Sequence, residues 1–386
     1  MSSHDRRRYV VALAAVAAGL GAIVVLRPFA THDAHARPEL QRVLDGLVTG
    51  PNRVAPGVAA YVIGPRGTWS GAAGVANVAT GERMTTDARF RIESNSKTYL
   101  VAAALQLVRE RKLRLEDTVE HWYPGLLHRN GELITLRELM TDTSGLIDDN
   151  DLNTAQATRK ALANVGDPRL LAQLIALARR VSSGEAVYAS PVPLIRLAGW
   201  QPLLFTPGTR YHHGNIGWNL AGMIVARAAG KPLADVYRER IFAPLGLTNT
   251  RYDPQGPIQG RHAHGYALLK DGKVADRTSV HAFKGADGAI VTSARDEATF
   301  LRAFWTGKLV DRRDLLAFYG TGGAAGGCPG DARDGIGTGD GYRSFSWSDG
   351  TFGKRFAVLL LNGNRSGSPP VDPIPERASR RLYCAS

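Results

Sequence analysis

Short, β-rich apolar segments lie near both ends of the chain, and this distribution constrains the fold more than any other sequence feature. Residues 57–63 are apolar, and Gly64-Pro65-Arg66-Gly67 separates them from a second extended segment at 68–70. Residues 342–348 and 355–361 flank Asp349-Gly350, a typical hairpin turn. We expect the two terminal hairpins to join in one antiparallel sheet.

Between and after these hairpins, the apolar periodicity predicts helices. The predicted helices are residues 98–111, 134–140, 168–181, 218–229, 295–305 and 374–383. The predicted fold class is α+β: an antiparallel sheet built from N- and C-terminal strands, flanked by helices, with a mostly helical inserted region at roughly 110–285. Residues 37–386 are expected to form this domain.

Residues 1–36 have the features of an export signal or an N-terminal membrane anchor. Arg6-Arg7-Arg8 precede an apolar run at 9–26, and Ala34-His35-Ala36 suits cleavage before Arg37. The basic residues also resemble a twin-arginine signal. The apolar run has the length of a long signal core or of a minimal membrane span. We therefore expect an extracytoplasmic protein, either secreted or anchored.

Charge and cysteine usage agree with export. The net charge is +13, but no nucleic-acid motif accompanies it, so we expect a basic surface that faces an anionic cell-wall polymer or a membrane rather than nucleic acid. Cys328 and Cys384 are the two cysteines. In an oxidising compartment they would form one disulfide, and the alternative is two free thiols. Neither has metal-ligand spacing, so no metal or other cofactor is predicted.

The segment at 90–98 carries the chemistry. Ser94 and Lys97 are three residues apart, a spacing that places both side chains on one face of a helix start. A serine hydroxyl needs a base to become a nucleophile, and a desolvated lysine can be that base. The alternative for the isolated pattern is a capping serine followed by a surface lysine.

The context of Ser94 resembles the superfamily of serine β-lactamases and D-alanyl-D-alanine carboxypeptidases, in its class C-like branch. The resemblance covers most of residues 37–386. It rests on Pro56-Gly57-Val58, on Ile134-Thr135-Leu136-Arg137 followed by Thr143-Ser144-Gly145-Leu146, on Phe205-Thr206-Pro207-Gly208, on Pro244-Leu245-Gly246-Leu247 and on residues 285–294. It implies that Ser94 is the nucleophile. One departure is Asp142, which stands where the family signature has His.

The second family motif, Y-x-N, corresponds to His213-Gly214-Asn215. The resemblance implies that Asn215 holds the lysine and the substrate amide. His213 replaces the tyrosine, and a neutral imidazole can accept a proton near pH 7. The alternatives are a histidine that only fills space, or a shifted register in which Tyr211 or His212 takes this position.

The third family motif, K-T-G or H-x-G, is altered. One register matches Thr338-Gly339 and leaves Gly337 at the cation position, whereas another places Ile336 at the histidine position. Both registers lack the cation that meets a substrate carboxylate. Thr338 and Gly339 are the predicted substrate-binding residues, with a strand N–H near Gly339 as an oxyanion donor. Arg333 or Arg343 could replace the lost cation.

The sequence therefore predicts an exported serine hydrolase that forms an acyl-enzyme on Ser94. The expected substrates are small peptides, esters or β-lactams, with D,D-carboxypeptidase-like or β-lactamase-related activity implied by the resemblance. Loss of the third-motif cation favours an esterase or amidase variant. The alternative is a non-catalytic relative that binds wall fragments or a partner protein.

Overall fold

The computed structural model describes residues 37–386 except 51–52, 129, 153, 183–188, 255, 270–271, 281–282, 321–323, 326–330, 340, 350–352 and 366–372. Residues 37–386 form one compact unit. The predicted export signal at 1–36 and Cys328 lie outside the described residues.

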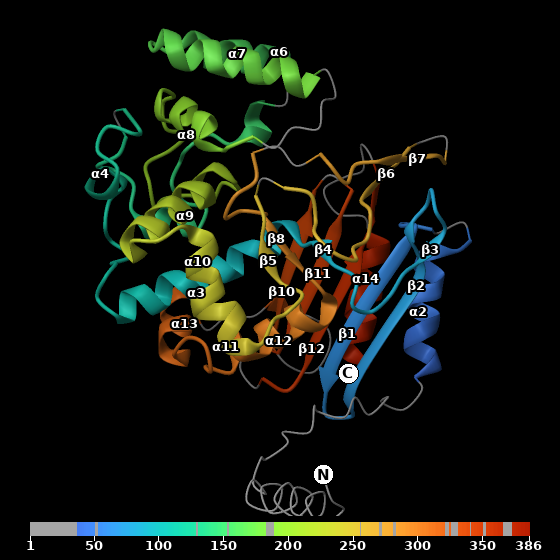
Figure 1. Ribbon diagram of the computed structural model, residues 1–386. Helices are drawn as coiled ribbons and strands as arrows, with labels where there is room; N and C mark the ends of the chain where they lie inside the picture. Colours follow the sequence, from blue (N-terminus) through green and yellow to red (C-terminus); the bar gives the residue numbers. More distant parts are fainter. Residues whose placement is uncertain are drawn as a thin grey trace, which may run out of the picture. The chain divides into compact units, whose positions relative to one another are not determined.

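The elements follow the expected order of strands, helices and strands (Figure 1). The N-terminal part contains α2 (Pro38–Val48), β1 (Gly57–Gly64), β2 (Gly67–Asn77), β3 (Glu82–Arg83), β4 (Phe90–Arg91), η1 (Glu93–Asn95) and α3 (Ser96–Arg109). The middle contains α4 (Val119–Trp122), α5 (Leu136–Met140), η2 (Asp149–Leu152), α6 (Ala155–Ala163), α7 (Pro168–Ser182), α8 (Val192–Gly199), α9 (Ile216–Ala229), α10 (Leu233–Tyr237), η3 (Arg238–Phe242), α11 (Ala243–Leu245), β5 (Arg251–Tyr252), β6 (Tyr266–Leu268) and β7 (Val274–Asp276). The C-terminal part contains β8 (Ile290–Thr292), α12 (Ala294–Trp305), α13 (Arg312–Tyr319), β9 (Ala324–Ala325), β10 (Asp331–Thr338), β11 (Arg343–Ser348), β12 (Phe356–Leu361), β13 (Gly363–Arg365) and α14 (Pro373–Cys384).

The main sheet joins the two ends of the chain. Its strand order is β3-β2-β1-β12-β11-β10-β9, and β1 pairs antiparallel with β12, for example Ala60 with Leu359. The α+β fold class, with its antiparallel sheet of terminal strands, is confirmed. The predicted helices are also found, each within about two residues of its expected bounds.

Helices cover both faces of this sheet (Figure 1). On one face, Phe345, Trp347 and Leu359 pack against Leu44 of α2 and Leu382 of α14. The other face packs against α12 and the larger core that surrounds α3 and α9. The segment that carries Ser94 lies on this second side, because η1 contacts β10 and β11.

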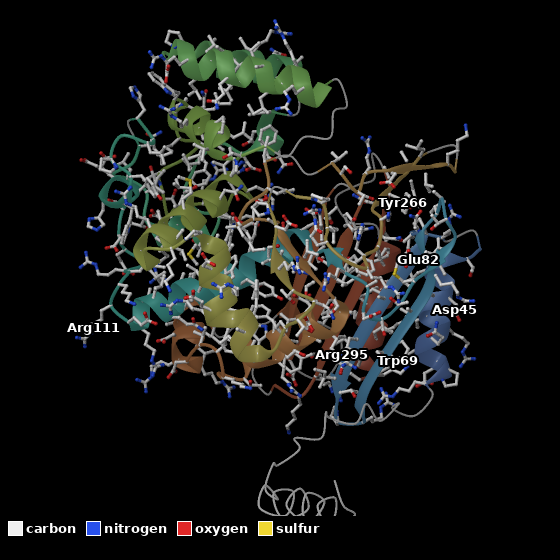
Figure 2. All side chains as sticks on the ribbon, viewed as in Figure 1. Asp45, Trp69, Glu82, Arg111, Tyr266 and Arg295 are labelled. Atoms are coloured by element: carbon white, nitrogen blue, oxygen red, sulfur yellow. The ribbon has the colours of Figure 1, made fainter. Side chains whose placement is uncertain are left out.

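The inserted region contains more than helices. β6 pairs with β7 and with β13, and β5 pairs with β8 next to β4; these short strands were not predicted. Tyr266 of β6, labelled in Figure 2, accepts a hydrogen bond from the Val78 N–H at 2.8 Å, which ties this small sheet to the end of β2. The pairing of β4 with β8 places the loop before β8 beside the segment that leads into Ser94.

Candidate active site

Ser94 lies in the short 3-10 helix η1, which runs directly into α3. Ser94 is partly exposed, whereas Lys97 in the first turn of α3 is only 9% exposed. The first backbone N–H groups of a helix have no acceptor within the helix, so they can meet an oxyanion. The structure therefore gives Ser94 the exposure that a nucleophile needs and gives Lys97 the burial that a lysine base needs.

The turn that carries Ser94 is fixed by its neighbours. Asn95 Nδ2 donates to Ser344 Oγ at 2.8 Å and to Ser346 Oγ at 3.1 Å, and Ser344 Oγ donates to the Ile92 carbonyl at 2.6 Å. On the other side, Ser96 Oγ accepts a hydrogen bond from the Ile290 N–H at 3.1 Å. Strands β8 and β11 thus hold both flanks of Ser94, which limits its conformational freedom.

Lys97 contacts the second-motif histidine. Its Nζ lies 3.4 Å from His213 Nε2 and 5.5 Å from the centre of the Trp218 ring. Burial lowers the pKa of Lys97, and the carboxylates of Asp142, Asp287 and Asp148 oppose this effect. Partial burial and the nearby Lys97 charge also lower the pKa of His213. Both groups are therefore shifted toward their neutral forms, which can accept protons.

The alternative second-motif residues point elsewhere. His212 Nε2 pairs with Asp151 Oδ2 at 2.9 Å, and Tyr211 is 69% exposed and interacts with Asp142 rather than with Lys97. Of the three candidates, His213 is the one that contacts Lys97.

Asp142, the departure from the family signature, belongs to the same cluster. Its Oδ1 accepts hydrogen bonds from Trp218 Nε1 at 2.8 Å and from the Gly214 N–H at 3.4 Å. Burial raises its pKa, while the charges of Lys97 and His213 lower it. Sequence reasoning noted this substitution but gave it no role; its place at the histidine position within the family signature was the available signal.

Asn215 is held by two aspartates that sequence reasoning missed. Asp148 Oδ1 accepts from the backbone N–H groups of Asn215 at 2.6 Å and Ile216 at 3.1 Å, so it caps α9. Asn215 Nδ2 donates to Asp149 Oδ1 at 3.1 Å. Burial and the neighbouring Asp148 raise the pKa of Asp149 to about 7. The Asn215 amide is thus oriented by Asp149, a partner that the resemblance did not imply.

The glycines of β10 lie directly against the nucleophile turn. A Cβ atom at Gly335 would lie 2.4 Å from Asn95 Oδ1, and one at Gly337 would lie 2.0 Å from the Ile92 carbonyl oxygen. Ile336 instead packs in the core beneath α2 and α14. Side chains alternate along a strand, so Gly337, not Ile336, occupies the position that faces Ser94. This cation position has no side chain.

The other third-motif predictions find less support in the geometry. The Thr338 side chain is exposed and points to the sheet face opposite that of Gly337 and Gly339. The Gly339 N–H donates to the Tyr342 carbonyl at 3.1 Å, so this N–H is already used within the hairpin. Arg343 is buried over the Phe345 ring, on the sheet face away from Ser94. The side chain of Arg333 lies outside the described residues.

Among the described residues, no cluster of His, Cys, Asp and Glu could hold a metal ion. Over the same part of the chain, no helix is both long and apolar enough to cross a membrane.

Comparisons with known proteins agree with this geometry. The model of the Beta-lactamase family matches residues 40–357. Protein Rv1367c of Mycobacterium tuberculosis is 26% identical over 63% of this chain and 60% of its own length. A putative D-alanyl-D-alanine carboxypeptidase of Escherichia coli is 27% identical over 45% of this chain and 36% of its own. Esterase EstB of Burkholderia gladioli is 30% identical over 46% and 41%.

The chain thus spans 60% or less of the length of these relatives. Among solved structures, the D-amino acid amidase of Ochrobactrum anthropi superimposes with a TM-score of 0.71 and 23% identity, covering 90% of this chain and 97% of the amidase. At this identity the likeness shows a common fold.

Proposed function

The chain belongs to the β-lactamase family, and on that basis we propose that it is an exported serine hydrolase that cleaves small amides or esters through an acyl-enzyme on Ser94. The observation that carries this proposal is the buried Lys97, one helical turn from a partly exposed serine and 3.4 Å from His213. A buried lysine of lowered pKa beside an imidazole has little structural use, but it is a suitable base for a serine.

The proposed reaction has two halves. In the first, Lys97 accepts the Ser94 hydroxyl proton while Ser94 Oγ attacks the substrate carbonyl, and the Ser94 backbone N–H stabilises the oxyanion. The proton then passes to the leaving amine or alcohol, with His213 as the second proton carrier next to Lys97. In the second half, water attacks the acyl-enzyme, and the same bases accept its proton and return it to Ser94.

The charges around the site favour substrates without a carboxylate. The cation position of the third motif is Gly337, and Arg343 lies on the other face of the sheet. The groups near Lys97 include three carboxylates, those of Asp142, Asp148 and Asp287. An anionic substrate would be repelled by them without a compensating cation. A neutral amide or ester suits the site better than a D-Ala-D-Ala terminus or a β-lactam, and the relative EstB is named an esterase.

Export is part of the same proposal. Residues 1–36 carry the signal or anchor pattern, and Cys384 is disulfide-bonded, which is typical of an oxidising compartment. The basic surface would face anionic wall polymers or lipid headgroups.

A matched pair of esters tests the proposal. The full chain in mild detergent is incubated with p-nitrophenyl butyrate, with its carboxylate analogue mono-p-nitrophenyl glutarate, and with benzylpenicillin. Ser94→Ala is the control, and intact-protein mass spectrometry detects the acyl-enzyme. We expect turnover of the neutral ester, at least tenfold slower turnover of the anionic one and a weak penicillin adduct, all abolished in Ser94→Ala.

A preference for the anionic ester would refute the substrate class while leaving the hydrolase intact. No adduct with any acyl donor or with a fluorophosphonate would favour the second candidate, a non-catalytic binder of wall fragments or a partner protein. The altered third motif and the use of the Gly339 N–H by Tyr342 are the observations in favour of that candidate.

A further inference from the structure

Glu93, the residue directly before Ser94, has an unusual conformation and location for a glutamate. Its φ is +51°, in the left-handed region that favours glycine, and it is 1% exposed. The left-handed backbone conformation is unfavourable for a residue with a side chain, and a buried carboxylate is costlier still unless it is paired. Glu93 therefore has both an unfavourable backbone conformation and a buried carboxylate directly beside Ser94.

Lys284 offsets the buried charge. Its Nζ lies 3.3 Å from Glu93 Oε2 and 3.8 Å from Asp287 Oδ2, and both carboxylate side chains are 2% exposed. Burial alone would lower the pKa of Lys284, but Glu93, Asp287 and Asp149 raise it more strongly, so the ammonium stays charged. Lys284 lies in the loop that leads into β8, the strand that pairs with β4 just before η1.

The glycines around Glu93 leave room for this pair. A Cβ atom at Gly339 would lie 2.2 Å from Glu93 Cδ, and one at Gly288 would lie 3.1 Å from Lys284 Cδ. The Glu93 carboxylate therefore fills the space beneath the end of β10, between the nucleophile turn and the strand that flanks the oxyanion position. The pair joins three segments at this point: η1, the end of β10 and the loop at 284–288.

Given the hydrolase activity proposed above, we propose that Glu93 and Lys284 are a positioning pair for Ser94. Glu93 holds η1 against β10, and Lys284 cancels a negative charge that would otherwise oppose the oxyanion beside Ser94. The two partners are not equivalent. Loss of Lys284 removes the cation that contacts both Glu93 and Asp287, whereas loss of the Glu93 charge leaves Lys284 still paired with Asp287.

This asymmetry can be measured as the rate at which a fluorophosphonate labels Ser94 in the full chain. We expect Lys284→Met to lower the rate by about 100-fold and Glu93→Gln by less than about fivefold. The double variant should recover at least tenfold over Lys284→Met, because the carboxylate next to Ser94 is then neutral and only Asp287 has lost its cation. Lys284→Arg should keep most of the wild-type rate. All rates are taken at 15 °C on samples whose circular dichroism matches wild type, so that lost stability is not read as lost positioning.

Equal labelling rates in wild type and Lys284→Met would overturn the proposal, as would a double variant no faster than Lys284→Met. If Lys284→Met does not fold, Lys284→Arg and the double variant carry the comparison, and a double variant that labels more slowly than Glu93→Gln by 100-fold would contradict it.

A urea-unfolding cycle on wild type, Lys284→Met, Glu93→Gln and the double variant separates this inference from the proposed function. The exposed pair Lys231–Glu239, 2.5 Å apart, is the control, with Lys231→Met and Glu239→Gln. We expect the buried pair to couple by at least tenfold in the unfolding equilibrium constant and the exposed pair by less than about threefold. If wild type does not react with any acyl donor or fluorophosphonate, the hydrolase proposal fails. The unfolding cycle then still tests whether Glu93 and Lys284 stabilise each other, and an absence of coupling would refute the positioning pair.

Discussion

Glu297 provides a prediction whose size follows from the structure. It lies in α12 with no exposed surface, and its Oε2 accepts a hydrogen bond from Tyr99 OH at 2.7 Å. Its Oε1 accepts a weaker one from Ser346 Oγ at 3.4 Å, the same hydroxyl that accepts from Asn95 next to the nucleophile. Burial raises the pKa of Glu297 from 4.5 to about 7.

The native protein therefore keeps a proton on Glu297 that the unfolded chain releases. Between pH 4.5 and about 7 the native state binds more protons than the unfolded state, so the free energy of unfolding falls as the pH rises through this window. A shift of about 2.5 pH units at about 1.4 kcal/mol per unit amounts to about 3 kcal/mol. Glu297→Gln cannot titrate, so it should lack this loss and be more stable than wild type at pH 8.

Urea unfolding of both proteins at pH 5, 6, 7 and 8 measures the effect, with the exposed Glu39→Gln as the control. We expect the wild-type free energy of unfolding to fall about 2 kcal/mol further than that of Glu297→Gln between pH 5 and 8, and Glu39→Gln to follow wild type. Parallel curves for wild type and Glu297→Gln would refute the reasoning, because they would mean that Glu297 ionises in the native state as easily as in the unfolded one.

Three further predictions concern the site itself. His213→Ala should lower kcat/KM for a neutral ester by about 100-fold with little change in KM, because it removes a proton carrier but no substrate contact; an unchanged kcat would make His213 a space-filling residue. Asp142→Asn removes a carboxylate that raises the pKa of Lys97 but keeps an acceptor for Trp218, so the acid limb of the fluorophosphonate labelling profile should move to lower pH. A shift to higher pH would contradict this assignment. Gly337→Ala should destabilise the protein by about 2 kcal/mol or more in urea unfolding, because its Cβ would meet Ile92 and Ser344; Gly46→Ala in α2, which meets nothing within 4 Å, is the control and should be neutral or stabilising.

The parts of the fold that the sequence predicted are those encoded locally. Hairpins are specified by short alternating segments and a turn, and Ser94 and Lys97 are brought together by the pitch of a single helix. The third motif could be located only to within one residue, because a strand shifted by one residue presents its other face, and burial of Ile336 under α2 and α14 determines which face that is.

The missed residues depend on contacts between distant segments. Asp148 and Asp149 come shortly after the Thr143-Ser144-Gly145-Leu146 match, but nothing in the sequence indicates their partners, because their role arises only where α9 begins beside this loop. Lys284 lies in a glycine-rich loop where nothing in the sequence indicates a partner for Glu93. Such pairs become visible only when packing brings the two segments together.

The glycines of the altered third motif and the Glu93–Lys284 pair lie in the same region beside Ser94. The space beside Ser94 beneath β10 is limited, because a Cβ atom at Gly339 would overlap the Glu93 carboxylate and one at Gly337 would overlap the Ile92 carbonyl. A side chain at Gly339 would therefore compete with the Glu93 carboxylate for the same volume, and a lysine at the cation position, Gly337, would meet the Ile92 carbonyl. In this chain the Glu93 side chain of η1 fills the space and β10 has glycine there. The nearby cation is Lys284, and it is paired with the buried carboxylates of Glu93 and Asp287. A cation held in this way stabilises the turn that carries Ser94 but is not available to bind a substrate carboxylate. The proposed substrates are therefore neutral amides and esters.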